Sequence, residues 1–243
     1  MVGGQALAFW MGWLGVTAAE DLPVVSRDLD ILATASDKKL VYRIAEAISG
    51  QAIFPNKRAL TALVGQAVRF VSATEYVNVD VIHRVYGDFT AASILERAIE
   101  VEIGSAAIKV MHPFDVLRSR IENLAGLPEK QNDLGIGQAR AAVEVAREFL
   151  AVVAGQHDDE QQRLALVLKA FKSIEKLARS SVGRKVAKAF DVHVADAIAP
   201  DLLELAQFQK KKWPQLIALL SDQRAAQLGI TRPSSPTAAD GGR

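Results

Sequence analysis

The chain has 243 residues, half of them hydrophobic, which is enough for one large domain or two small ones around a packed core. Cysteine is absent, so disulfide frameworks, thiolate zinc sites and cysteine nucleophiles are excluded. The four histidines show no His-x-x-x-His or Glu-x-x-His spacing, so any metal ion must be held by oxygen ligands.

Charge is distributed unevenly along the chain, although the net charge is only +1. Residues 160–224 contain twelve Lys or Arg against seven Asp or Glu, a net charge of +5, so the remainder carries −4. An acidic part suits metal binding, and a basic part suits a polyanion. The simpler alternative is that these cations only solvate the surfaces of helices.

The apolar stretch at residues 1–19 has the hydrophobicity of a signal peptide or a short membrane anchor. No Lys or Arg precedes Arg27, whereas a signal peptide needs a basic start and a membrane span needs basic flanks. We therefore predict a cytoplasmic protein that does not enter a membrane. An anchor at residues 1–19 stays an alternative, which recovery without detergent would exclude.

The same stretch contains a glycine pair. We expect Val2 to end a strand, Gly3 and Gly4 to form a tight turn, and residues 5–14 to form a buried helix. Glycines at such a turn let a phosphate approach the backbone and the free N–H groups of the first helical turn. A strand usually has about five residues, and only Met1 and Val2 precede the pair, so the first strand is expected to be shortened.

Hydrophobic periodicity predicts two successive regions. The first has strands at residues 26–34, 62–72, 76–86, 100–103 and 107–111, and helices at residues 36–50, capped by Ser36, and 89–98. The second has helices at residues 114–124, 137–153, 158–182, 185–193 and 201–228, the last interrupted at Pro214. The expected fold is α+β, with a mixed-sheet domain at residues 1–111, an all-helical domain at residues 112–230 and a disordered tail at residues 231–243.

Acidic residues on two of the predicted strands are the strongest chemical signal. Asp28 and Asp30 are two residues apart on one strand, so their carboxylates project from the same face. Such close like charges favour a divalent cation with oxygen ligands. Asp80 lies on a second strand and is a third candidate ligand. The alternative for Asp28 and Asp30 is an exposed edge strand with two solvated acids.

The glycine pair, the Asp28-Leu29-Asp30 strand and the further strand aspartate Asp80 together resemble the nucleotidyltransferase superfamily that shares the palm of DNA polymerase β. Within that superfamily the chain looks most like the toxin-type nucleotidyltransferases of abortive-infection and type IV toxin–antitoxin systems. Those proteins also have a helical C-terminal region, and residues 112–120 and 129–133 occupy the start of it here. The resemblance covers about residues 2–150.

This resemblance implies an α+β nucleotidyltransferase domain, followed by the helical domain, that uses two Mg²⁺ or Mn²⁺ ions. The metal ligands and catalytic residues would be three acids: Asp28, Asp30 and Asp80. The nucleotide-binding residues would be the glycine turn and two cations: Gly3, Gly4, Gln5, Arg120 and Lys130.

The implied reaction transfers a nucleotidyl group from a nucleoside triphosphate to an acceptor hydroxyl. The acceptor would be RNA, such as a tRNA end, or a protein, and the chain would act as the toxin paired with a cognate antitoxin. The alternative is a catalytically silent protein that keeps the fold as an interaction module. The three retained acids argue against that alternative, and the shortened first strand argues for it.

Overall fold

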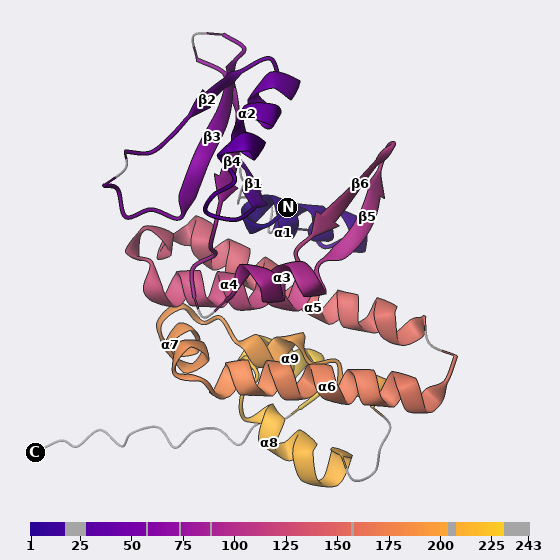
Figure 1. Ribbon diagram of the computed structural model, residues 1–243. Coiled ribbons are helices and arrows are strands. Elements are labelled where there is room, and N and C mark those ends of the chain that lie inside the picture. Colours follow the sequence, from indigo (N-terminus) through magenta and orange to yellow (C-terminus); the bar gives the residue numbers. More distant parts are fainter. Residues whose placement is uncertain are drawn as a thin grey trace, which may run out of the picture.

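The computed structural model describes residues 1–17, 28–56, 58–72, 74–87, 89–156, 158–203 and 208–230 of the protein. This part is α+β: a small mixed sheet and a two-stranded sheet lie at one end, and helices follow them (Figure 1). The fold class predicted from the sequence is confirmed at this level. The predicted tail at residues 231–243 lies outside the described residues.

The larger sheet contains β1 (Asp28–Leu32), β2 (Gln51–Ile53), β3 (Leu63–Phe70) and β4 (Tyr76–Ile82). Its strand order is β1-β4-β3-β2. The β1–β4 pair is parallel and the other two pairs are antiparallel, so the sheet is mixed as predicted. The three-residue strand β2 was not predicted, because so short a segment shows no alternation.

Helix α2 (Lys38–Ala47) covers one face of this sheet. Its buried residues Val41 and Ala45 pack against apolar side chains of the strands, among them Val79 and Val81 of β4. Since side chains alternate along a strand, residues 28 and 30 of β1 and residues 78 and 80 of β4 project from the opposite face.

The predicted cap of α2 is wrong by one residue. Asp37, and not Ser36, occupies the N-cap position, and its side chain does not cap the helix. Oδ2 of Asp37 instead accepts hydrogen bonds from the backbone N–H and the hydroxyl of Thr34, at 3.2 and 2.8 Å. This local turn competes with the cap for the same carboxylate.

The first two residues join the two sheets. Val2 forms an antiparallel bridge with Asp30, and its N–H donates to the Asp30 carbonyl at 2.9 Å. The carbonyl of Met1 accepts from the N–H of Met111 at 2.9 Å, beside the hairpin of β5 (Ile99–Ile103) and β6 (Ala106–Val110). Val2 thus contributes a single bridge to the larger sheet, and not the end of a strand as predicted.

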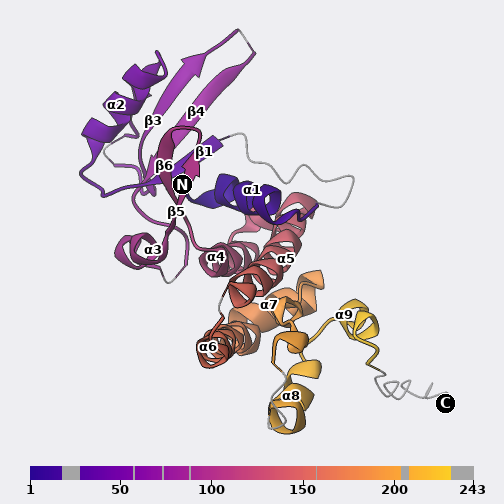
Figure 2. The same cartoon turned by 90° about the vertical axis from the view of Figure 1, so that its right-hand side faces the viewer.

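Helix α1 (Gly3–Leu14) starts at the glycine pair itself, so the prediction of a separate turn before the helix is corrected. The helix contacts β1 on one side and the helices α4 (Pro113–Gly126) and α5 (Asp133–Gly155) on the other. Figure 2 shows α1 between the sheet and these two helices, with α2 on the other side of the sheet. Trp10 of α1 is fully buried there, and its indole N–H donates to the Met111 carbonyl at 2.8 Å.

The remaining helices differ from the predicted boundaries. α3 (Ala91–Arg97) is shorter than expected. The two helices predicted at residues 158–182 and 185–193 are present as α6 (Glu160–Arg179) and α7 (Ser181–Phe190), but the boundary between them lies earlier than predicted, at Ser180. Ser180 makes the break, because its hydroxyl accepts from the N–H of Gly183 at 3.0 Å and caps α7.

The helix predicted at residues 201–228, with an interruption at Pro214, is wrong. The chain instead forms 3₁₀ turns at residues 194–197 and 200–202, a π-helical turn at residues 208–212, and the short helices α8 (Trp213–Ile217) and α9 (Asp222–Gln227). Pro214 lies in the first turn of α8, where its missing N–H removes no helical hydrogen bond. In the part of the chain that the structure describes, no helix combines the length and the hydrophobicity needed to cross a membrane.

Candidate functional site

The parallel pairing of β1 and β4 brings the three predicted acids together. Asp30 lies directly opposite Asp80, and Asp28 lies opposite Asn78. Neighbouring strands are about 4.8 Å apart, and alternate residues of one strand are about 6.6 Å apart. The carboxylates of Asp28, Asp30 and Asp80 therefore form one cluster on the face that α2 leaves uncovered, and we call it the carboxylate cluster.

Two amide side chains hold this cluster. Nδ2 of Asn78 donates to Oδ1 of Asp80 at 2.7 Å and to Oδ1 of Asp28 at 3.2 Å. Nε2 of Gln66, on β3, donates to the same Asp80 oxygen at 2.8 Å. Neither amide is among the residues predicted for the site. Alternation places Asn78 on the face of Asp80, but the position of Gln66 follows only from the register between β3 and β4.

The start of α1 packs directly on Asp30. Gly3 has a φ of +69°, in the left-handed region, and a Cβ atom there would overlap Oδ2 of Asp30. Gly4 is buried beside it, and Gln5 completes the first turn. The N-terminal end of a helix carries partial positive charge, so a carboxylate or a phosphate is favoured nearby.

The two predicted cations also act on Asp30. Arg120 of α4 is buried, and its Nη1 donates to Oε1 of Gln138 at 3.1 Å. Its Nε has no hydrogen-bond partner among the described residues. Lys130 is exposed at the end of the 3₁₀ turn η1 (Pro128–Lys130). The positive charges of Arg120 and Lys130 both act to lower the pKa of Asp30.

The acidity of Asp30 reflects these opposing neighbours. The pKa of Asp30 is raised to about 6, with burial as the largest cause, and the negative charges of Asp80 and Asp28 contribute to this rise. Arg120 and Lys130 offset only part of this rise. A strongly perturbed acid beside further acids is typical of a functional site, because such a group gains a great deal from a bound cation.

Metal binding fits the chemistry of these donors. The cluster offers three carboxylates, and Asn78 Oδ1 is a buried oxygen without a hydrogen-bond partner among the described residues. Oxygen ligands of this kind suit Mg²⁺ and Mn²⁺. In their present rotamers, no three acidic, His or Cys side chains of the described residues come close enough to hold a metal ion. The Asn78 amide instead occupies one oxygen each of Asp28 and Asp80.

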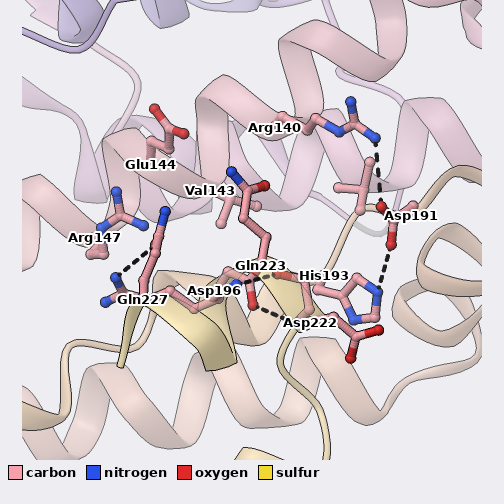
Figure 3. A pocket seen from close by; sticks show the side chains of 13 residues that line it. Arg140, Val143, Glu144, Arg147, Asp191, His193, Asp196, Asp222, Gln223 and Gln227 are labelled. Atoms are coloured by element: carbon pink, nitrogen blue, oxygen red, sulfur yellow. Dashed lines mark hydrogen bonds and ion pairs between the residues drawn. The ribbon is translucent and has the colours of Figure 1, made fainter. Parts of the chain in front are cut away.

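A separate cavity of about 520 Å³ lies in the helical part, between α5, the turn after α7 and α9 (Figure 3). Three of its side chains pair with one another: Asp191 lies 3.9 Å from Arg140 and 3.1 Å from Nε2 of His193. None of the predicted site residues lines this cavity. The carboxylate cluster, where like charges crowd together, is therefore the candidate site, and this cavity is not.

Comparison with models of known protein families gives no match for this chain, and no curated protein is significantly similar to it. The assignment of function therefore depends on the geometry of the carboxylate cluster.

Proposed function

We propose that the protein is a metal-dependent nucleotidyltransferase that uses a nucleoside triphosphate. The observation that carries this proposal is the position of Asp30. It is paired with Asp80 on the neighbouring parallel strand, and it touches Gly3 at the positive end of α1. The acids that are proposed to hold a metal ion thus adjoin a helix end that favours phosphate.

In this proposal Asp28, Asp30 and Asp80 hold Mg²⁺ or Mn²⁺. The ions supply positive charge to the triphosphate and to the attacking and leaving oxygens. The first turn of α1, at Gly3 to Gln5, offers backbone N–H groups to the phosphates, and Arg120 and Lys130 offset the remaining negative charge. The nucleotidyl-transfer step is then mainly a matter of positioning and electrostatics.

The bonds exchanged are simple. A hydroxyl oxygen of the acceptor attacks the α-phosphorus and loses its proton, and the bond from that phosphorus to the bridging oxygen of the β-phosphate breaks. Pyrophosphate is the leaving group. The proposed acceptor is RNA, such as a tRNA end, or a protein hydroxyl.

Incubation with each labelled triphosphate, Mg²⁺ and total RNA or protein tests the proposal. We expect the wild-type protein to transfer label and Asp30→Ala to transfer none, whereas Glu102→Ala, on the exposed β5, transfers as the wild type does. Equal labelling by the wild type and Asp30→Ala would refute the assignment. Absence of any metal-dependent nucleotide binding would instead favour the catalytically silent interaction module.

A role as the toxin of a toxin–antitoxin pair belongs to the same proposal. It predicts that expression of the wild-type chain arrests growth and that expression of Asp30→Ala does not. A cognate antitoxin would be recognised as a co-expressed protein that restores growth.

A further inference from the structure

The β3–β4 hairpin extends away from the helical part that follows the sheets (Figures 1 and 2). Two exposed aromatic residues lie at its far end. Phe70 ends β3 and Tyr76 begins β4, and the two residues are directly paired. Their side chains are 64% and 59% exposed, and their ring centroids are 6.4 Å apart with the planes tilted by 55°. Two adjacent aromatic rings left this open to water form an apolar patch suited to a planar ligand.

These rings share a face with the carboxylate cluster. Residues 76, 78 and 80 alternate with the residues of β4 that pack on α2, and residues 66, 68 and 70 of β3 pair with them. The hydrogen bonds from Gln66 and Asn78 to Asp80 identify this as the face of the acids. Tyr76 is four residues from Asp80, or about 13 Å along the strand.

The chemistry of the patch matches nucleobases better than phosphates. Every base has a flat face that stacks on an aromatic ring whatever the sequence. Stacked nucleotides advance about 3.4 Å each along a strand, so about four of them span the 13 Å from Tyr76 to Asp80, and fewer do so when extended. The hairpin end carries little net charge, with Arg69 and Glu75 beside the rings. Binding there would thus depend on stacking more than on phosphate contacts.

From this geometry, and given the nucleotidyl transfer proposed above, we propose that the acceptor is a single-stranded nucleic acid. Its bases stack on Phe70 and Tyr76 while its terminal hydroxyl lies at the carboxylate cluster.

Fluorescence anisotropy with a labelled single-stranded RNA 12-mer tests this inference on the full chain. Loss of one base–ring stack weakens binding by about 5-fold to 150-fold, so we expect the double variant Phe70→Ala/Tyr76→Ala to bind at least that much more weakly. The exchange Phe70→Tyr/Tyr76→Phe keeps both rings and should bind as the wild type does. Tyr42→Ala is the matched control, because Tyr42 is also 59% exposed but lies on α2, on the other face of the sheet.

The outcomes separate this inference from the function on which it rests. If the alanine variant loses RNA affinity and keeps metal-dependent triphosphate binding, the stacking surface is supported. RNA affinity unchanged in the alanine variant, or lost equally in the ring-exchanged variant, would overturn it, as would label transferred only to protein. If RNA binds through the rings but no nucleotidyl group is transferred, the surface stands and the proposed reaction fails.

Discussion

Oδ2 of Asp30 occupies the space that a Cβ atom on Gly3 would need, so the candidate metal ligand packs on the backbone at the start of α1. Gly3 also has a positive φ, which L-residues with a side chain rarely adopt. Both constraints act at one position, and they couple the geometry of the helix end to the orientation of the Asp30 carboxylate.

Substitution of this glycine should therefore disrupt the site. We expect Gly3→Ala to displace the Asp30 carboxylate and to cost about 1–2 kcal/mol through the left-handed backbone alone. Metal-dependent triphosphate binding should weaken about tenfold or more, as is usual when the support of a metal ligand is lost. Calorimetric titration and thermal unfolding measure the two effects.

Gly12→Ala is the control for that variant. Position 12 lies in the same helix, but a Cβ atom there meets nothing within 4 Å. Alanine in a helix interior is more stable than glycine by about 0.5–1 kcal/mol, so this variant should be slightly stabilised and should bind normally. Equal loss of binding in both variants would mean that contact with Asp30 is not the cause.

The raised pKa of Asp30 predicts a pH dependence of stability in the metal-free protein. Between the ordinary pKa of 3.8 and the folded value of about 6, the native state binds more protons than the unfolded state. The free energy of unfolding should therefore fall as pH rises through this range. Asp30→Asn has no such proton to lose. Its free energy of unfolding should therefore exceed that of the wild type by an amount that grows with pH and levels off above pH 6.

The size of that advantage at pH 7 is expected to be about 1–2 kcal/mol, because partial exposure reduces the cost of the charge. Denaturant unfolding at pH 4, 5, 6 and 7 measures it. Glu102→Gln, at an exposed position, should show no comparable trend. A wild type that becomes more stable than Asp30→Asn as pH rises would contradict the burial of Asp30.

The positive charge of Arg120 is expected to limit the rise in the pKa of Asp30. Replacement by methionine keeps much of the apolar stem but removes the positive charge, so the pKa of Asp30 should rise above 6. Loss of a charged hydrogen bond costs about 1.5–3 kcal/mol, which predicts triphosphate affinity lower by about one to two orders of magnitude. Carboxyl-carbon NMR titration and nucleotide binding measure these changes.

Arg43→Met is the matched control, because Arg43 is exposed on α2, over the opposite face of the sheet. It should change neither the pKa of Asp30 nor nucleotide affinity. Arg120→Lys keeps the positive charge but lacks the planar guanidinium group. The pKa of Asp30 should therefore stay closer to its wild-type value than the triphosphate affinity does. An unchanged Asp30 pKa in Arg120→Met would show that the guanidinium does not reach this carboxylate.

In the metal-free protein, the Asn78 amide is predicted to satisfy carboxylate oxygens that a metal ion would otherwise bind. Asn78→Leu removes the donor shared by Asp28 and Asp80, and the unmet acceptors should destabilise the metal-free protein by about 1–3 kcal/mol. Mg²⁺ should raise the thermal midpoint of this variant more than that of the wild type, since the ion meets the same oxygens. Gln66→Leu removes a single bond to Asp80 and should show the smaller effect. An equal rise of the thermal midpoint with Mg²⁺ in the wild type and in Asn78→Leu would contradict this prediction.

The helical part shows where local patterns are insufficient. Periodicity found α4 and α5, because their apolar residues repeat over several turns. It placed the boundary between α6 and α7 too late in the chain and merged the segments after residue 200 into one interrupted helix, because the apolar repeat continues across Ser180 and Pro214. In each case a short polar or cyclic residue ends one helix and starts the next, and whether it does so depends on the packing of the flanking turns.

Sequence alone determined the acidic residues of the cluster and the faces from which they project, because alternation along a strand is a local property. The tertiary structure decided that β1 and β4 are parallel neighbours in the register that pairs Asp30 with Asp80, and that α2 covers the other face. It also decided that Gln66 bonds to Asp80 and that Arg120 lies near enough for its charge to lower the pKa of Asp30. Pairing between distant strands and the side on which a helix packs are set by burial of the whole apolar surface, which no local stretch of residues encodes.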